Sequence, residues 1–332
     1  MATYPDDYGL VVGINHYPGF KNLSGAINDA KKFDNWLTDT NNGGGLPQEN
    51  RRLIVSSADA NKPIQEDIDV ALVELFDRIG SNQVRRFYLY FSGHGLASSS
   101  MGADLCLSVW SHIRRNAALD SEAYYELLAG TGRFEEIVCF FDCCRVRLSN
   151  SKGAASSLGR PKPDQLSGHE RRMIAYSTEY QNAAYEAEND IDSSDVRGYF
   201  TQALLEALNG NAAQTQGGVP AKRLKQYVEN RTRALAENDG KTQIPEVDIS
   251  FISENEPIFG DALPSRKVVI AFSTAKVGRN IDVIGPEDSV LKTIVATEQP
   301  VSLPLGAGIH LLCDGVDGSN IAIREGDEHV KF

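Results

Sequence analysis

The chain has few cysteines, no long apolar run and no excess of positive charge. Its 332 residues include five cysteines, two tryptophans and three methionines. No apolar stretch approaches the roughly 20 residues that a membrane-spanning helix needs. The net charge of −12 argues against nucleic acid or an anionic membrane surface as a partner, and it suits a protein that attracts basic segments. The first residues have neither the basic region nor the apolar core of a secretory signal, so we expect a cytoplasmic protein.

The cysteine pattern also argues against a disulfide framework and a zinc site. The count is odd, and four of the five thiols fall in or beside predicted strands, which favours reduced thiols in a cytosol. Cys143 and Cys144 are adjacent, so on a strand they point to opposite faces. No CxxC pair and no nearby pair of histidines completes a tetrahedral ligand set. We therefore predict no metal site.

One stretch, residues 135–145 with the sequence EEIVCFFDCCR, combines a core strand with chemically active side chains. Its first half is a short apolar run, typical of a strand buried on both faces. Alternation along the strand places Asp142 and Cys144 on one face. Cys139 and Cys143 then point to the other face. Ligands of open α/β sheets bind beyond the carboxyl ends of the strands, so this position is a candidate site.

A second strand ends in a matching way. Residues 87–91 (FYLYF) form an apolar run that leads directly into the tetrapeptide SGHG at residues 92–95. Ser92 and His94 then lie on one side of the chain, and the two glycines between and after them have no side chains. His94 lies about 50 residues upstream of Cys144, a spacing found between the His and the Cys of caspases.

SGHG and DCCR, in this order and at these strand ends, resemble the motifs of caspase-like cysteine peptidases of the C14 type. The metacaspases and their prokaryotic relatives, the orthocaspases, are the closest branch, and the resemblance covers roughly residues 8–250. It implies a cysteine endopeptidase in which Cys144 is the nucleophile and His94 the general base. Gly95 leaves its N–H open beside His94, so with the Cys144 N–H it is a candidate oxyanion hole.

The same resemblance implies a basic substrate. It maps three residues of the primary specificity (S1) pocket, and all three are retained here as Asp29, Ser92 and Asp142. Two acids and a hydroxyl at the base of a pocket would hold a guanidinium through charge-assisted hydrogen bonds. Caspases proper need arginines there to bind aspartate, whereas residues 173–190 contain no Arg or Lys. We therefore expect cleavage after Arg or Lys, in proteins that expose such sites.

Two features depart from the metacaspase pattern. Metacaspases usually continue Cys-His-Ser-Gly, whereas residues 144–147 here are Cys-Arg-Val-Arg. The calcium site of that family uses several aspartates, for which Asp104 and Asp120 are the candidates. Ser121 stands where the second acid of an Asp-Asp pair is expected. We therefore expect no cofactor and no calcium dependence, and we place Asp120 on the solvated surface.

Strands that alternate with helices predict an α/β fold with a caspase-like, mostly parallel sheet flanked by helices, over residues 1–255. Residues 253–266 have the composition of a linker. Short β-branched runs from residue 267 to residue 332 predict a small all-β, sandwich-like accessory domain. The strands expected in the first domain cover residues 8–15, 52–55, 87–91, 103–110, 135–141 and 173–178, and the helices start near residues 24, 63, 119, 198 and 220.

Residues 148–168 are rich in Ser, Gly, Lys and Pro and predict a loop between the two halves of the fold. Caspase-like enzymes are often made as zymogens and cut in such a loop. An enzyme with an acidic pocket would cut itself there, or an upstream protease would activate it. The candidate processing sites are Arg147, Lys152, Arg171 and Arg172. A role in prokaryotic stress, defence or cell-death proteolysis rests on family analogy.

Two other interpretations stay open. The first is a catalytically inactive caspase-like scaffold, which the retention of both His94 and Cys144 disfavours. The second is a flavodoxin-like binding domain, which lacks a glycine fingerprint after the first strand. Hydrolysis of a fluorogenic arginyl peptide, with and without Cys144→Ala, separates these interpretations from a peptidase.

Overall fold

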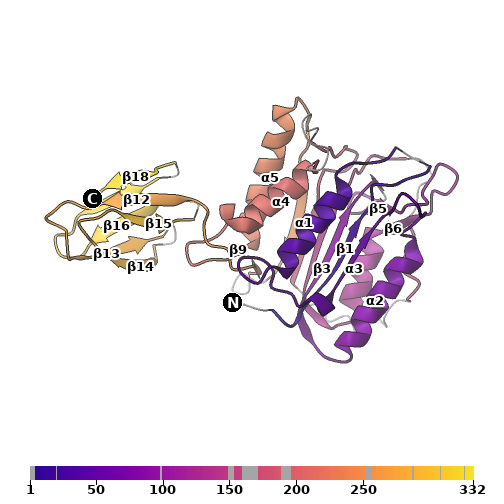
Figure 1. The fold of residues 1–332 in the computed structure, drawn as a ribbon, viewed down its shortest axis with the longest axis horizontal. Helices are drawn as coiled ribbons and strands as arrows, with labels where there is room; N and C mark the ends of the chain where they lie inside the picture. Colours follow the sequence, from indigo (N-terminus) through magenta and orange to yellow (C-terminus); the bar gives the residue numbers. More distant parts are fainter. Residues whose placement is uncertain are drawn as a thin grey trace.

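The computed structural model describes residues 4–19, 21–97, 99–148, 153–158, 171–187, 196–251, 256–285, 288–306, 308–324 and 326–332. An α/β portion is followed by a β-rich portion at the C-terminal end (Figure 1). The helices are α1 (Ala26–Thr38), α2 (Gln65–Ile79), α3 (Ser121–Gly130), α4 (Tyr199–Glu206) and α5 (Ala221–Asn238). The strands of the first portion are β1 (Asp7–Gly13), β2 (Arg51–Val55), β3 (Val84–Ser92), β4 (Gly95–Ala97), β5 (Ala103–Cys106), β6 (Ala118–Asp120), β7 (Phe134–Asp142), β8 (Arg171–Tyr176), β9 (Val219–Pro220), β10 (Glu246–Ser250) and β11 (Ile258–Phe259).

Six strands form the central sheet in the order β10-β8-β7-β3-β1-β2. All neighbours pair in parallel except β10, which runs antiparallel to β8 at the edge. β3 and β7 lie in the middle and are buried along almost their whole length, as their apolar runs predict. Their carboxyl ends meet at one edge of the sheet, directly before His94 and Cys144.

Helices cover both faces of this sheet (Figure 1). Because side chains alternate along β3, Phe87 packs with α2 and α3, whereas Tyr88 and Tyr90 pack with α1, α4 and α5. Phe33 on α1 stacks on Tyr90 with the ring centroids 4.4 Å apart. This contact fixes α1, which carries Asp29, against the strand that ends in Ser92.

Two elements differ from the sequence prediction. The strand expected over residues 103–110 is shorter and lies outside the central sheet, in a small antiparallel sheet with the order β4-β5-β6. The chain turns back after His94, so β4 pairs with β5 and not with β3. The edge strand β10 was not predicted, because only Val247 and Ile249 among its five residues are large apolar side chains.

The loop expected at residues 148–168 is partly held on the fold. Residues 153–158 are described, and Ala154 pairs with Leu119 at the small sheet. The buried Asp69 carboxylate accepts hydrogen bonds of 2.6–2.9 Å from the Ser156 hydroxyl and from the N–H and hydroxyl of Ser157. Composition alone could not predict this docking, because the receiving carboxylate comes from the distant helix α2.

Strand β8 begins at Arg171, two residues before the predicted start. Arg171 forms an ion pair of 2.7 Å with Glu136, and Arg172 one of 2.7 Å with Asp248. Both candidate processing sites therefore lie in strand β8 of the central sheet. Lys152 lies outside the described residues.

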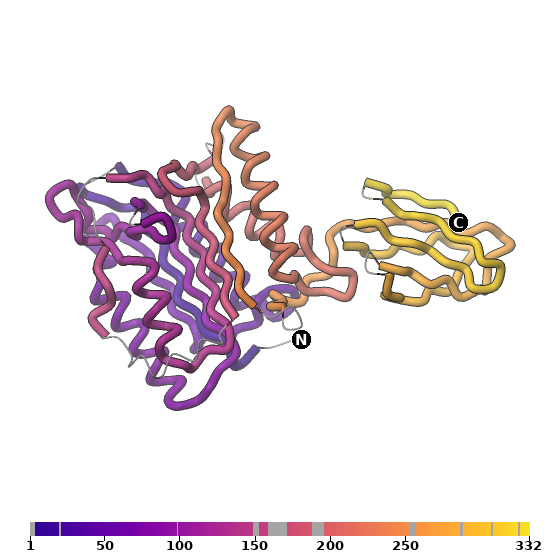
Figure 2. The backbone as a smooth tube through the Cα atoms, turned by 180° about the vertical axis from the view of Figure 1, so that it is seen from behind, coloured from indigo at the N-terminus to yellow at the C-terminus, as the bar shows by residue number. Residues whose placement is uncertain are grey.

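The C-terminal strands form two small sheets that share one apolar core. One sheet has the order β15-β12-β18, in which β12 runs antiparallel to β15 and parallel to β18. The other has the order β14-β13-β16-β17, and its neighbours all pair antiparallel. They project from one end of the α/β portion when the molecule is seen from either side (Figures 1 and 2). The strands are β12 (Lys267–Ala271), β13 (Asn280–Ile284), β14 (Val290–Val295), β15 (Val301–Pro304), β16 (His310–Asp314), β17 (Asn320–Ile323) and β18 (His329–Lys331).

The segment between the two portions is packed and not a free tether. Ile258 and Phe259 form β11, which pairs with β9. The Phe259 side chain is fully buried, and the guanidinium of Arg86 lies 4.5 Å from the centre of its ring. The expected linker is therefore integrated into the α/β portion for at least part of its length.

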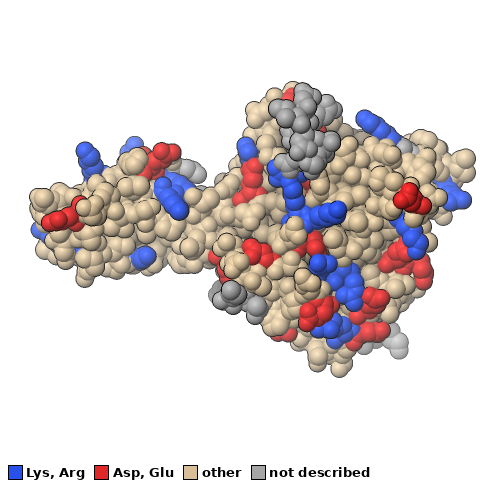
Figure 3. Space-filling view, in the orientation of Figure 1, with Lys and Arg blue, Asp and Glu red and all other residues tan. Residues whose placement is uncertain are grey.

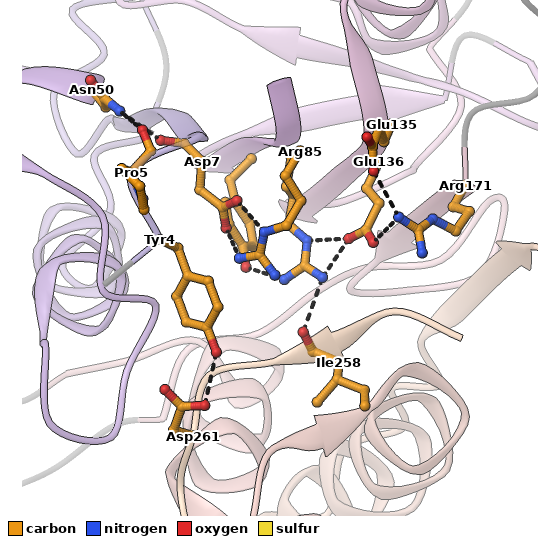
Figure 4. Close-up of polar contacts among 12 residues, drawn as sticks. Tyr4, Pro5, Asp7, Asn50, Arg85, Glu135, Glu136, Arg171, Ile258 and Asp261 are labelled. Carbon is orange, nitrogen blue, oxygen red and sulfur yellow. Dashed lines mark hydrogen bonds and ion pairs between the residues drawn. The ribbon is translucent and has the colours of Figure 1, made fainter. Parts of the chain in front are cut away.

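Charged side chains gather where β1, β3 and β7 begin (Figure 4). The buried Arg86 forms an ion pair with the buried Glu136, and it also donates to the Ile258 carbonyl at 3.0 Å. Arg85 donates to Asp7 at 2.6 Å. On the face shown in Figure 3, acidic and basic side chains are interspersed over the α/β portion. Among the described helices, none combines the length and the apolar character needed to span a membrane.

Candidate active site

A cavity of about 540 Å³ lies at the carboxyl edge of the central sheet. Parallel pairing places Gly13, Ser92 and Asp142 side by side at the ends of β1, β3 and β7. The structure brings all the predicted dyad and S1 residues to this cavity. Its lining includes Asp29, Ser92, His94, Asp142, Cys144, Glu186, Lys21 and Lys241.

His94 follows β3 and is held by two contacts from the loop after β1. Its backbone N–H donates to the Tyr17 hydroxyl at 2.9 Å, and the two rings lie 4.7 Å apart. Its Nε2 lies 2.5 Å from the Lys21 carbonyl. A carbonyl only accepts, so this contact assigns the proton to Nε2 and leaves Nδ1 as the basic nitrogen. Burial lowers the pKa of His94, which keeps the ring neutral at pH 7.

Cys144 is half-buried, and its neighbour Cys143 is buried in the core on the α2 and α3 side of the sheet. The opposite orientation of the two thiols follows from strand alternation, as the sequence predicts. The Cys144 sulfur accepts from the Ala184 N–H at 3.3 Å. Burial raises its pKa despite this bond, so the resting group is a thiol and not a thiolate.

Gly95 is required at its position by close packing. A Cβ there would lie 2.6 Å from both the Cys143 sulfur and the Cys144 carbonyl oxygen. Any other residue would displace the chain around the nucleophile. The backbone of Gly95 therefore lies next to that of Cys144, which is the proximity that the proposed oxyanion hole needs.

The acidic residues of the pocket are almost completely buried. Asp29 accepts from the Gly198 N–H at 3.0 Å and from the Ser92 hydroxyl at 3.3 Å, both on Oδ2. Its Oδ1 is buried with no hydrogen-bond partner among the described residues. Asp142 accepts from the N–H and the hydroxyl of Thr201, at 3.1 and 2.7 Å. No cationic side chain forms an ion pair with either carboxylate within the described part of the chain.

Crowding makes these carboxylates hard to ionise. Burial, and then repulsion from Asp142, raises the pKa of Asp29 well above its ordinary value. Burial raises the pKa of Asp142 to about 6, although the Thr201 hydrogen bonds oppose this shift. Two like charges in one desolvated site are stabilised by a proton or by a cation.

Glu186 is a third carboxylate of this cavity that the sequence analysis missed. It accepts from the backbone N–H groups of Ser24 and Gly25, at 3.1 and 2.8 Å, at the start of α1. Its negative charge contributes to the raised pKa of both Asp29 and Asp142. The only signal in the sequence was that residues 173–190 lack Arg and Lys, since Glu186 lies in an irregular segment with no periodicity.

Arg145, which follows the nucleophile, does not line the cavity. Its side chain is fully buried, pairs with Glu246 and donates to the Ser100 carbonyl at 2.8 Å. Its guanidinium lies 4.3 Å from the centre of the Tyr176 ring. Because its charge is already compensated there, Arg145 does not supply the cation that a pocket for aspartate would need.

The two calcium candidates serve structural roles. Asp104 is buried and accepts from the Gly153 N–H at 2.6 Å. Asp120 was expected on the solvated surface, but it caps α3 by accepting from the N–H groups of Glu122 and Ala123. Among the described residues, no three acidic, histidine or cysteine side chains converge on a point that could hold a metal ion.

Comparison with known proteins identifies the family of the α/β portion. The model of the peptidase C14 family, described as the caspase domain, matches residues 7–255. A protein named as a probable protease from a Desulfuromonadales bacterium is 31% identical over 218 residues. That match covers 61% of this chain but only 26% of the relative.

The fold is similar to that of caspase-1 from Spodoptera frugiperda. The TM-score is 0.50 at 15% identity, and the match covers 79% of this chain and 92% of the caspase. The predicted fold class, a caspase-like α/β sheet with further β structure at the C-terminal end, is confirmed. With a family match over three quarters of its length, the chain belongs to the peptidase C14 family of caspase domains.

Proposed function

We propose that this chain is a cysteine endopeptidase that cleaves proteins after Arg or Lys, with His94 and Cys144 as its catalytic dyad. The observation that carries the proposal is the buried acidic pocket beside the Cys144 thiol. Asp29 Oδ1 has no hydrogen-bond partner in the described residues, and Asp142 and Glu186 share the cavity. A guanidinium or ammonium would satisfy these oxygens, whereas an aspartate side chain would add a further negative charge.

The reaction starts from a neutral dyad, because burial lowers the pKa of His94 and raises that of Cys144. The thiol proton moves to Nδ1 of His94 as the sulfur attacks the substrate carbonyl. The N–H groups of Gly95 and Cys144 stabilise the resulting oxyanion. Collapse of this intermediate breaks the peptide bond, and His94 returns the proton to the leaving amine. Water, activated by His94, then hydrolyses the thioester and regenerates the thiol.

The dyad is tested with single substitutions. Cys144→Ala or His94→Ala removes a group that acts only together with its partner, so activity on an arginyl peptide falls by several orders of magnitude. Cys143→Ala, the matched control, removes a core thiol and leaves most of the activity. If Cys143→Ala is inactive while Cys144→Ala is active, the nucleophile is Cys143, and the proposed assignment is wrong. A wild type without activity would favour the inactive scaffold.

The specificity is tested by profiling a peptide library with wild type and with Asp142→Asn and Asp29→Asn. A pocket with buried carboxylates discriminates by roughly 10⁴ against a residue that leaves them unpaired. Both variants therefore lose the preference for Arg and Lys. Asp34→Asn is the control, since Asp34 is also a buried acid of α1 but pairs with Arg51 at 3.0 Å. Dominant cleavage after Asp by wild type contradicts the proposal.

We further propose that the chain is made as a zymogen and processed at Arg147. Arg147 is exposed, whereas Arg171 and Arg172 would be cut only if β8 left the central sheet. Wild type and Cys144→Ala are incubated, and the termini of their fragments are read by mass spectrometry. A wild type that is fully active while intact shows that processing is unnecessary. A role in prokaryotic stress, defence or cell death is proposed from family analogy alone.

A further inference from the structure

Lys241 places a second, positive recognition element in the substrate cavity. It follows the end of α5, where Gly240 adopts a positive φ of 66° and turns the chain toward the cavity. Its ammonium lies 5.3 Å from the centre of the Tyr185 ring and 5.6 Å from that of Tyr199. Both Lys241 and Tyr185 line the cavity that contains Cys144.

This ammonium has aromatic neighbours but no carboxylate partner within 4 Å in the described part of the chain. Most of the other charged side chains that line the cavity have a defined partner, as Glu186 does with the N–H groups of Ser24 and Gly25. Ring faces attract a cation without neutralising it. Lys241 therefore keeps its net charge and its hydrogen-bond donors for a ligand.

Tyr185 and Glu186 place the Lys241 ammonium next to the acidic pocket. They are consecutive residues, and Tyr185 contacts Lys241 while Glu186 belongs to the group with Asp29 and Asp142. The Tyr185 N–H donates to Gln243 at 2.8 Å, which ties the segment to the chain just after Lys241. A substrate lying across the cavity thus meets a negative subsite and, next to it, a positive one.

We propose that Lys241 is a specificity-determining residue that selects an acidic side chain within two residues of the basic residue in the first subsite. This inference rests on the proposed function. The substrate class is then a segment in which Arg or Lys stands close to Asp or Glu. Charge complementarity of both signs along one short peptide fixes its register in the cleft.

The test uses matched quenched peptides with one Arg, in which each of the two positions on either side is Asp, Asn or Lys in turn. At one of these positions, wild type cleaves the Asp peptide about tenfold better than its Asn isostere. This ratio corresponds to the free energy of about one charge-assisted hydrogen bond. Lys241→Met abolishes this ratio, Lys241→Arg keeps it, and Lys241→Glu reverses it in favour of Lys. The ratio also falls as salt is added.

Lys222→Met is the matched control, because the Lys222 ammonium also lies over a ring, that of Phe251 at 5.6 Å, but outside the cavity. It leaves the ratio unchanged. Equal cleavage of Asp and Asn peptides by wild type overturns the inference while the proposed function stands. A gain on all arginyl peptides in Lys241→Met, with the ratio unchanged, also overturns it, since Lys241 then only offsets the pocket charge. If wild type cleaves no basic peptide, both proposals fail.

Discussion

The two ends of β3 and β7 differ in how their buried charges are compensated. At the amino end, the neighbouring residues Arg86 and Glu136 are paired in register and neutralise each other. At the carboxyl end, the neighbouring residues are Ser92 and Asp142, and among the described residues no cationic side chain forms an ion pair with the acid. The same two strands, in one continuous ladder, therefore carry a satisfied network and an unsatisfied one.

The satisfied end explains how the protein tolerates a buried arginine. Arg86 donates to Tyr88 at 2.7 Å and to the Ile258 carbonyl at 3.0 Å, besides its ion pair with Glu136. Glu136 in turn pairs with Arg171 at 2.7 Å (Figure 4). Buried ions are tolerated only when such bonds replace water. Because the fold pairs buried charges at one end of these strands, the acids without a cation at the other end support the proposed binding of a basic side chain.

The largest effect on stability is expected at the paired end. Arg86→Met leaves a buried network without its central cation, so the free energy of unfolding falls by about 3–5 kcal/mol. Asp142→Asn removes a buried charge that has hydrogen bonds from Thr201 but no cationic partner among the described residues, and the free energy of unfolding stays the same or rises. Urea unfolding of both variants, under conditions in which wild type unfolds reversibly, measures the difference. Equal destabilisation by the two substitutions would show that the two ends of β3 and β7 do not differ in how their buried charges are compensated.

A smaller effect is expected from pH. The pKa of Asp142 rises from 3.8 to about 6 on folding, so the folded state binds its proton more tightly than the unfolded state. This contribution to stability is complete below pH 3.8 and is lost as the pH rises through about 6. Wild type should therefore lose stability relative to Asp142→Asn between pH 5 and pH 7. The measurement is the thermal unfolding of wild type and of Asp142→Asn across this pH range.

A cationic ligand tests the ionisation of the pocket in the same kind of unfolding experiment. Benzamidine carries the cation that the ionised pocket lacks, so it should raise the melting temperature of wild type more at pH 7.5 than at pH 5. Asp142→Asn should show a smaller rise with little pH dependence. A ligand effect that is larger at pH 5 would show that the pocket does not bind the cation through ionised carboxylates.

How far the sequence predicts this molecule depends on where each residue lies. Strand alternation was enough to place Asp142 and Cys144 together, and the ends of two parallel strands brought His94 to the same edge. Glu186 was missed because it lies in an irregular segment, where no period indicates what a side chain faces. The contact between Asp69 and Ser157 was also missed, since their partnership depends on how distant elements pack.

The smallest effect on stability is expected from removing the β-rich portion. This truncation shows whether the charge network around Arg86 and Glu136 depends on residues beyond Arg266. A chain that ends at Arg266 keeps Ile258 and Phe259, and with them the bonds of Arg86. The contacts it loses include two hydrogen bonds that Thr215 makes, to His310 at 3.2 Å and to Gly306 at 3.3 Å. We expect the free energy of unfolding of the α/β portion to change by about 1 kcal/mol or less, and cleavage of small peptides to persist.

A chain that ends at residue 251 is the matched control for this prediction. It removes Phe259, whose loss from a buried site costs about 3–5 kcal/mol, and it unpairs one donor of Arg86. Urea unfolding and peptide hydrolysis of the two chains are compared with the full chain. If the chain ending at Arg266 is folded but inactive, the β-rich portion belongs to the catalytic unit. If the two shortened chains are equally stable, the segment 256–266 is only a tether, and the paired end does not depend on it.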